Sequence, residues 1–445
     1  MSAPRSHLIT ALLLVAASIG SAATAQLLPS VGQAVGGIGN LPVLGGVLGG
    51  PHGQGGSSAL SNSAPGVLRT LDTVAVEGLS RLDPASLLDI RRLRLRELVR
   101  ENGRALEMDN DGNPVRRGEL VAVNPDEASL NAARGAGFGV LRDARSGELG
   151  LRMTILSAPH KLGAREALKR LRQAAPGIDA DYNHLFEPAG SALSVVAGPA
   201  LVGGGGGSAT RIAMIDGAVA SHPSLAAASI EQKGFAGNPA PTGHGTAVAS
   251  LLVGDQGPFQ GAARGASLIV ADVYGGNRAA GSAEAVVRAL SWAVTKRPQV
   301  INISLVGPDN RLLARAIEAV ERRGIAVVAA VGNDGPAAPP QFPASYPGVI
   351  AVTAVDARDR ALNEAGKAAH LDFAAPGADL AAALPGRGYA RVRGTSFAAP
   401  LVAARLALAG TAMRLAAEAM PGKGRVGRGI ICRTCRIEPR LVGAK

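Results

Sequence analysis

The sequence has 445 residues, of which 47% are hydrophobic and 18% charged, and a formal net charge of +12. This balance is typical of a globular protein, and the length leaves room for about two or three domains. The arginines are spread along the chain and aromatic residues make up only 3% of it. Because nucleic-acid-binding proteins combine clustered basic residues with stacking aromatic rings, the composition argues against a nucleic-acid partner.

The N-terminus has the features of a secretory signal peptide. A polar start is followed by an apolar stretch at residues 8–20, which is too short to span a bilayer comfortably, and by Ala-Thr-Ala at 23–25, where a signal peptidase can cut. We therefore expect residues 1–25 to be removed on export to the periplasm or the medium, leaving no stable membrane span. An uncleaved anchor is the alternative. Residues 26–66, rich in Gly, Leu, Ser and Pro, are predicted to be a flexible linker.

Residues 67–118 are predicted to form an extension that contains a basic helix over 82–100 and a hairpin turn over 109–113. The Asp-Asn-Asp-Gly-Asn sequence of this turn is similar to the start of a calcium loop. The spacing does not fit, because Glu107 would hold the first ligand position and Gly118 the last, where a bidentate Glu is required. An Asp-Gly hairpin turn is the better interpretation.

Residues 119–187 have the pattern of a small α+β domain. The predicted strands cover 119–123, 140–143, 149–156 and 178–186, and the predicted helices cover 125–137 and 164–174. This β-α-β-β-α-β order is the split, ferredoxin-like arrangement. The glycine run at 203–207 is followed by no Gly-Lys-Ser/Thr sequence, which favours a surface loop over a phosphate-binding loop.

Residues 188–430 alternate between short apolar strands and helices. The predicted strands cover 212–215, 267–273, 300–304, 325–330 and 349–355, and the predicted helices cover 246–252, 282–295, 311–323 and 396–409. Such alternation predicts an α/β domain with a doubly wound, mostly parallel sheet that is covered by helices on both faces. Ligand sites in these sheets lie beyond the carboxyl ends of the strands.

The chemistry-bearing residues fall at that edge of the predicted sheet. They are Asp216 at the end of the first strand, His244 at a helix start, Asn333 after a strand, and Ser396 at the start of an apolar helix. Taken one at a time, each has a plainer interpretation: a turn Asp, a structural His, a turn Asn and a helix N-cap Ser.

In combination, the motifs resemble those of the subtilisin family of serine peptidases, in that family's order. They are Ile215-Asp216-Gly217 with His222-Pro223 downstream, then Gly243-His244-Gly245-Thr246, Gly332-Asn333-Asp334-Gly335 and Gly394-Thr395-Ser396-Phe397-Ala398-Ala399-Pro400. The resemblance extends over residues 211–410, and its last motif is highly specific.

The resemblance implies a serine endopeptidase that acts on protein or peptide substrates. His244 would take the proton of Ser396, whose hydroxyl is otherwise a poor nucleophile, and Asp216 would orient the imidazole. Asn333 would donate to the tetrahedral oxyanion. A catalytically silent binding or scaffold protein of the same fold is the alternative, although such a protein need not keep all of these residues. An esterase is a third hypothesis.

Residues 302–307 resemble the strand with which extended substrates pair in that family. The residues expected to bind substrate are Ser304, Leu305, Val306, Gly307 and Gly332. The family usually has glycine where Val306 stands, so the primary specificity pocket departs from the family pattern. Gly275-Gly276 resembles the opposing strand more weakly. A peptide-pairing strand has no evident purpose in an esterase.

Subtilisin-type propeptides have the same β-α-β-β-α-β order and directly precede the catalytic domain. The resemblance therefore implies that residues 119–187 are an intramolecular inhibitor and chaperone, with cleavage of the chain between Asp181 and Gly206. A permanent accessory domain is the alternative. The resemblance also allows a structural calcium ion, but its ligands are not identifiable, and we expect neither a catalytic metal nor another cofactor.

Residues 431–445 are predicted to be a basic C-terminal tail that carries Cys432 and Cys435. One Cys-x-x-Cys pair cannot complete a tetrahedral zinc site, and the strand-to-helix context of a redox-active pair is missing. In an exported protein a local disulfide is the favoured interpretation.

Overall fold

A computed structural model describes residues 82–189, 209–386 and 388–444. These residues all fall within the unit Gly66–Lys445. The predicted signal peptide, the linker over 26–66 and the glycine run over 203–207 lie outside the described residues. Among the described helices, none combines the length and the apolar composition that crossing a lipid bilayer requires.

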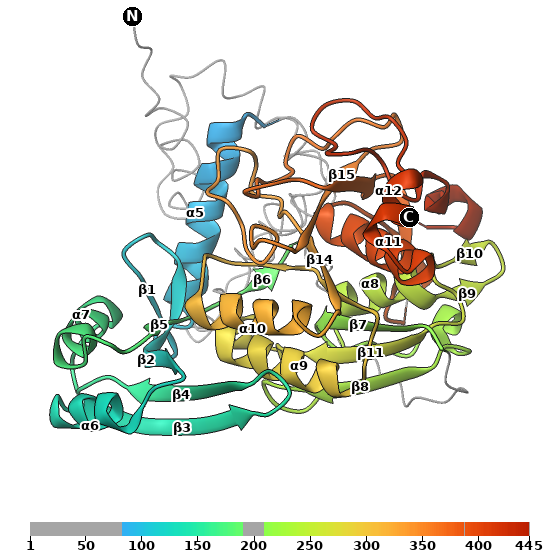
Figure 1. Cartoon of the computed structure of the whole chain (residues 1–445). Helices are drawn as coiled ribbons and strands as arrows, with labels where there is room; N and C mark the ends of the chain where they lie inside the picture. The colour runs from blue at the N-terminus through green and yellow to red at the C-terminus, as the bar shows by residue number, and fades with distance from the viewer. Residues whose placement is uncertain (1–81, 190–208, 387, 445) are drawn as a thin grey trace, which may run out of the picture. The chain divides into compact units, whose positions relative to one another are not determined.

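The larger domain is built around a parallel sheet of seven strands in the order β16-β15-β14-β12-β7-β11-β8 (Figure 1). The strands are β7 (Arg211–Asp216), β8 (Ile230–Gly234), β11 (Ser267–Asp272), β12 (Val300–Ile303), β14 (Ala326–Ala330), β15 (Ile350–Val355) and β16 (Phe373–Pro376). Every neighbouring pair runs parallel. The predicted α/β fold is therefore confirmed, although β8 and β16 were not predicted.

Helices cover both faces of this sheet, as predicted for a doubly wound fold. The helices are α8 (Gly243–Val253) and α11 (Thr395–Ala409) on one face and α9 (Ala283–Thr295) and α10 (Arg311–Glu321) on the other. Alternation along β7 shows why its sequence is apolar throughout: Ile212 and Met214 face the first pair of helices, while Ala213 and Ile215 face the second.

The smaller domain is an antiparallel sheet of five strands with two helices on one face. Its elements are β1 (Leu106–Met108), β2 (Pro114–Val123), α6 (Glu127–Gly135), β3 (Gly139–Ser146), β4 (Leu151–Ser157), α7 (Ala164–Ala174) and β5 (Ala180–His184). The order from β2 to β5 is the β-α-β-β-α-β order predicted for residues 119–187. Strand β1 joins this sheet through a turn at 109–113, where a hairpin was predicted.

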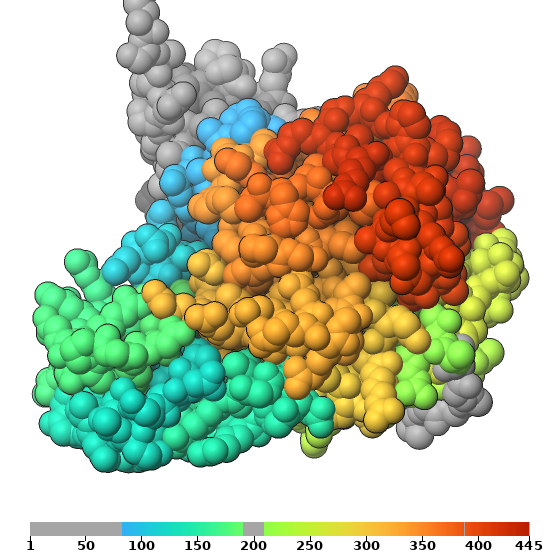
Figure 2. Space-filling view, in the orientation of Figure 1, coloured from blue at the N-terminus to red at the C-terminus, as the bar shows by residue number. Residues whose placement is uncertain are grey.

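The two faces of the smaller sheet have different partners. Leu120 and Ala122 pack under α6 and α7. Val121 and Val123, which point the other way, share a hydrophobic cluster with residues of α9 and α10. This second face therefore docks the smaller domain on the helices of the larger one, as the adjoining surfaces in Figure 2 also show.

Polar contacts surround this hydrophobic docking face. Arg142 donates two hydrogen bonds of 2.7 Å to Glu284 at the start of α9, and the hydroxyls of Ser146 and Ser291 lie 2.6 Å apart. The backbone N–H of Arg311 donates to Asp181 at 2.9 Å. These bonds fix the rotation of the smaller sheet on α9 and α10.

The predicted strand over 178–186 is shorter than expected. Strand β5 ends at His184, and the chain then leaves the smaller sheet and forms β6 (Glu187–Pro188). β6 pairs antiparallel with β13 (Leu305–Val306), beside the large sheet. Pairing with a distant part of the chain divides a segment whose sequence reads as one strand.

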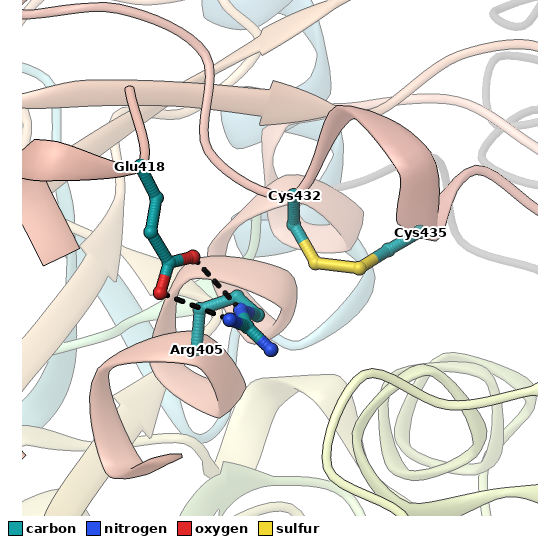
Figure 3. The surroundings of a disulfide bond; sticks show 4 residues. All are labelled: Arg405, Glu418, Cys432 and Cys435. Carbon is teal, nitrogen blue, oxygen red and sulfur yellow. Dashed lines mark hydrogen bonds and ion pairs between the residues drawn. A yellow bond between two sulfur atoms is a disulfide. The ribbon is translucent and has the colours of Figure 1, made fainter. Parts of the chain in front are cut away.

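The C-terminal segment, which the sequence predicted to be a tail from residue 431, packs into the larger domain. Ile431 and Ile437 are buried in the main core, and the N–H of Ala381 donates to the carbonyl of Ile437. Cys432 and Cys435 form the predicted disulfide, which Figure 3 shows with the ion pair of Arg405 and Glu418.

Shorter elements complete the described chain. They are α5 (Pro84–Glu101), β9 (Asp255–Gln256), β10 (Phe259–Gln260), β17 (Leu380–Leu384), β18 (Gly388–Val392), α12 (Ala412–Ala417) and short 3-10 turns at Pro223–Leu225, Arg278–Ala280, Arg433–Cys435 and Pro439–Val442. Asp83 caps α5, where its carboxylate accepts from the N–H groups of Ala85 and Ser86.

Candidate active site

Asp216 and His244 meet at the carboxyl edge of the large sheet. Asp216 is the last residue of β7 and His244 the second residue of α8, and both are buried. His244 Nδ1 lies 2.9 Å from Asp216 Oδ1, which also accepts the N–H of Gly217 at 2.7 Å. Because an ionised carboxylate can only accept, Nδ1 carries the proton in this pair and Nε2 is left as the basic nitrogen.

The glycines beside these two residues allow the contact. A Cβ on Gly217 would collide with the side chain of Thr242, and a Cβ on Gly245 would collide with the carbonyl of Gly217. Thr242 is the N-cap of α8 and accepts the N–H of Gly245 at 2.9 Å. The start of α8 can therefore lie directly against the end of β7, which brings the imidazole to the carboxylate.

His222, from the first motif, has a structural role. Its Nδ1 accepts the N–H of Ser224 at 3.1 Å, and its Nε2 donates to the carbonyl of Gly388 at 3.0 Å. Burial lowers the pKa of His222, which agrees with a neutral ring that uses one nitrogen as acceptor and the other as donor.

Ser396 is the second residue of α11 and is fully buried. The N-cap of this helix is Gly394, so the plainer interpretation of Ser396 as an N-cap is wrong. The His244 ring packs 5.4 Å, centroid to centroid, from the ring of Phe397, the next residue along α11. The imidazole therefore lies against the helical turn that carries the serine.

Ser396 Oγ and His244 Nε2 are both buried, and neither has a hydrogen-bond partner among the described residues. The structure thus contains no hydrogen bond between them. The backbone of Ser396 is held from the other side, because Ser304 Oγ donates to its carbonyl at 3.0 Å. Ser304 Oγ in turn accepts from Asn302 Nδ2 at 3.0 Å.

The carboxamide of Asn333 is held in one orientation by Thr395. The backbone N–H of Thr395 donates to Asn333 Oδ1 at 2.9 Å, and Thr395 Oγ1 accepts the N–H of Gly332 at 3.1 Å. Asn333 Nδ2 is consequently free to point away from the helix, and it donates to the carbonyl oxygen of Ala189.

The residues predicted to bind substrate contact the chain's own segment 186–189. Glu187 pairs with Val306 and Pro188 with Leu305, and the N–H of Ala189 donates to the carbonyl of Ser304 at 2.9 Å.

The two predicted glycines lie near the two ends of this segment. A Cβ on Gly307 would collide with the ring of Phe186, and the loop from Gly332 to Asn333 lies beside Ala189. The segment therefore lies along the strand that was expected to hold extended peptides.

Several residues at this site were not predicted. Phe186 is fully buried, and its carbonyl accepts from Tyr274 Oη at 3.1 Å. Burial raises the pKa of Tyr274 well above its ordinary value, so the phenol remains a donor. Asp272 holds the loop of Tyr274 by accepting its N–H at 2.8 Å, and burial raises the pKa of this carboxyl. The position of Asp272 near the end of the predicted strand 267–273 was the signal available in the sequence, and the structure places it beside Asp216 in the sheet.

The larger domain is similar in sequence to known proteins. Residues 207–420 match the model of the Subtilase family. Over 211 residues the chain is 34% identical to Subtilisin Savinase from Lederbergia lenta. The aligned region covers 45% of this chain and 76% of that protein. Over 215 residues it is 34% identical to the Major intracellular serine protease of Bacillus subtilis (strain 168). This aligned region covers 44% of this chain and 67% of that protein.

The chain belongs to the subtilase family. It is a subtilisin-like serine endopeptidase, as the motifs predicted. Among solved structures, fervidolysin from Fervidobacterium pennivorans, described as a keratinolytic enzyme related to subtilisin, is similar with a TM-score of 0.59. That likeness covers 73% of this subtilase and 61% of fervidolysin at 18% identity, and it concerns the fold alone.

Subtilases commonly bind structural calcium. Within the described ranges of this subtilase, no group of three or more His, Cys, Asp or Glu side chains could hold a metal ion. The side chains at hand therefore do not fit a calcium site formed by such a group, and we assign no ligands.

Proposed function

We propose that this subtilase is an exported serine endopeptidase that is made as a self-inhibited precursor and cuts its own chain after Ala189. Ser396 is the nucleophile and His244 the general base. Asp216 orients the imidazole, and Asn333 donates to the oxyanion. Ordinary substrates are proteins or peptides that bind in the extended form of segment 186–189.

The observation that carries the proposal is the way in which Ala189 is held. Its N–H donates to the carbonyl of Ser304 and its carbonyl accepts from Asn333 Nδ2. A donor on the carbonyl oxygen is what stabilises negative charge when that carbonyl carbon is attacked. The bond under attack is then the one that follows Ala189, which lies inside the cleavage window predicted from the sequence.

The proton path follows from the protonation of His244. With Nδ1–H on Asp216, the basic Nε2 takes the proton of Ser396 Oγ as that oxygen bonds to the carbonyl carbon. The imidazolium then gives the proton to the leaving amine as the peptide bond breaks. Water attacks the resulting ester by the same route, which frees the carboxylate and returns the proton to Ser396.

Inhibition of the precursor is supported by two surfaces that act together. The smaller domain docks its hydrophobic face on α9 and α10, and its C-terminal continuation, β6, occupies the substrate strand β13. Another peptide cannot pair with β13 until this segment has left. The predicted role of residues 119–187 as an inhibitor rests on this occupation.

Export is supported by features at opposite ends of the chain. Residues 1–25 have the pattern of a signal peptide. The disulfide between Cys432 and Cys435 fits an oxidising compartment, because such bonds are rare in proteins that stay in the cytosol.

The first test is the N-terminus of the purified mature protein. We expect intact mass and N-terminal sequencing to give a chain that begins directly after Ala189, and we expect Ser396→Ala to remain uncut there. An active wild-type enzyme that retains the smaller domain by a peptide bond would contradict self-processing.

The second test separates catalysis from processing. A fluorophosphonate probe should label mature wild type and the control Ser221→Ala, whose serine is exposed, and should not label Ser396→Ala. Equal labelling of wild type and Ser396→Ala would refute the assigned nucleophile. Hydrolysis of casein and of a simple ester are then compared. Preferred digestion of casein would support a peptidase, and preferred hydrolysis of the ester would support an esterase.

A further inference from the structure

The residue that departs from the family pattern at the substrate strand is Val306. It lies directly opposite Glu187 in the pairing of β13 with β6. Side chains alternate along an extended strand, so Ala189 projects to the same face as Glu187, two residues before it. The side chains of Ala189 and Val306 therefore lie on one face of this ribbon, and both are almost fully buried.

The backbone of Gly332 lies across from the side chain of Val306. A Cβ built on Gly332 would lie 3.3 Å from Val306 Cγ1 and 3.4 Å from Gln341 Cγ. The isopropyl group of Val306 thus reaches from β13 to the loop that carries Asn333. A glycine at 306 would leave the volume of both γ-methyl groups open at this point.

We infer that Val306 closes the primary specificity pocket and makes this subtilase prefer alanine, or a side chain no larger, on the acyl side of the cleaved bond. The inference rests on the proposed function, because it takes Ala189 as the residue before the cleavage site. A larger side chain has to displace Val306, which is buried and lies close to Gly332, and packed interiors resist added volume. The chain's own Ala189 meets this restriction.

The test uses the mature enzyme and peptides of the form Phe-Glu-Pro-Xaa with a chromogenic amine, in which Xaa is Ala, Leu or Phe. Pocket contacts of one or a few methylenes discriminate by about 10–200-fold. We expect wild type to favour Ala over Phe in kcat/KM by about 100-fold. Val306→Ala should reduce this ratio and Val306→Gly should reduce it further. Titration of active sites with fluorophosphonate corrects for any misfolded fraction.

Self-processing gives a second readout in the full chain. Ala189→Phe should block cleavage after residue 189, and Val306→Gly in the same chain should restore it. A wild type that cuts after Phe as well as after Ala, or a ratio that Val306→Gly leaves unchanged, would overturn the inference while leaving the peptidase function intact. A mature wild type that neither reacts with the probe nor cuts any of the peptides would instead overturn the proposed function.

A separate observation concerns α5, which precedes the predicted inhibitor domain. Arg91 and Arg94 of this helix each donate to the Asp334 carboxylate at 3.1 Å, and Asp334 directly follows Asn333. Arg94 also lies 3.5 Å from the carboxylate of Glu187 in β6. The side chain of Leu87 packs against Gly335, where an added Cβ would collide with it.

The carboxylates of these ion pairs are largely shielded from solvent, whereas the Arg94 side chain is 23% exposed. The side chains of Asp334 and Glu187 are each 8% exposed, and that of Arg91 is 9% exposed. Arg278 of the larger domain approaches the other oxygen of Glu187 at 3.7 Å. Glu187 is therefore held from the helix and from the cleft wall, which ties the segment before the cleavage site to the oxyanion loop.

We propose that α5 is a second inhibitory element, a strap that keeps segment 186–189 in the cleft. This also rests on the proposed function. The inhibitory part of the chain then begins at Pro84, not at residue 119. Once the bond after Ala189 is cut, release of α5 together with segment 186–189 requires Arg91 and Arg94 to leave Asp334, and Glu187 to leave Arg278.

The test follows the appearance of peptidase activity in the full-length chain. Arg94→Ala should shorten the delay before activity appears by about tenfold, because it removes the charge pair with Asp334, on which Arg91 remains. Arg92→Ala is the matched control, since within the described part of the chain Arg92 pairs only with Asp89 of the same helix, at an exposed position. Glu187→Gln weakens the contacts of Glu187 with Arg94 and with Arg278 of the larger domain, and it should shorten the delay too. Equal delays in wild type, Arg94→Ala and Glu187→Gln would overturn the strap, whereas absence of activity in wild type would count against the proposed function.

Discussion

The backbone N–H of Thr395 donates to Asn333 Oδ1 at 2.9 Å, which turns the amide nitrogen of Asn333 toward the carbonyl of Ala189. Asn333→Ala should therefore lower kcat sharply and change KM little, because its donor matters most when the oxyanion forms. Loss of such a donor in a subtilisin lowers kcat by about 10²–10³, and we carry that value over to this relative. Steady-state kinetics on a chromogenic peptide, normalised by fluorophosphonate titration, measure it.

Asn333→Asp provides a further check, because a carboxylate keeps the acceptor for Thr395 and loses the donor. It should be about as slow as Asn333→Ala. A reduction of kcat of less than about tenfold in both variants would contradict the assigned role of the carboxamide.

Arg393 should be important for stability because it neutralises a buried carboxylate. It donates to both oxygens of Glu364, at 2.6 and 3.1 Å, and the Glu364 side chain is 2% exposed. Arg393→Ala leaves this charge unpaired, which in proteins costs about 3–5 kcal/mol. Denaturant unfolding, in a Ser396→Ala background that prevents self-digestion, measures the loss. Arg391→Ala is the control, since Arg391 lies 3.7 Å from an exposed Asp379, and a similar loss in both variants would contradict the prediction.

Acid should loosen the docking of the smaller domain through Asp109. Burial acts to raise the pKa of Asp109, but hydrogen bonds with His184 and Asn113 leave it lowered. His184 Nδ1 in turn accepts from Asn310, the N-cap of α10, at 3.0 Å. The carboxylate thus supports a contact between the two domains.

The direction of this pH effect follows from the linkage between protonation and unfolding. A carboxyl whose pKa is lower in the folded than in the unfolded chain stabilises fully above the unfolded value of about 3.9 and loses that effect as the pH falls through the lowered value. The unfolding free energy of the Ser396→Ala precursor should therefore fall more steeply below about pH 4 than that of the same precursor with Asp109→Asn. Parallel pH profiles would refute the contribution of Asp109.

The disulfide near the C-terminus should stabilise the larger domain without affecting catalysis. Cys432 and Cys435 are three residues apart, and Cys432 belongs to the main core. In the chain-entropy description, closing so short a loop raises the unfolding free energy by about 2 kcal/mol. Replacing both cysteines by serine should lower the thermal midpoint of the Ser396→Ala protein while leaving fluorophosphonate labelling of otherwise wild-type enzyme unchanged. Slower labelling would show that the bond also supports the site.

Much of the fold was predictable because local patterns determine it. Helix α7 has the predicted ends. Strand β7 is longer than the predicted strand 212–215 by one residue at each end, Arg211 and Asp216. The division after His184 was not predictable, since β6 exists only by pairing with β13. Ala189 carries no chemical signature of its own, so its contact with Asn333 depends entirely on tertiary structure. The roles of Asp216, His244 and Ser396 in catalysis stay predictions until the variants are made.

The pairing of β6 with β13 has a consequence for how such a chain can change over generations. Under the proposed self-processing, one gene encodes both the cleft and its first substrate peptide. A replacement at Val306 then has to remain compatible with Ala189 in the same molecule before the enzyme acts on any other protein. Homologous chains should therefore vary at these two positions together. A change toward substrates with bulkier side chains would require a matching change at Ala189.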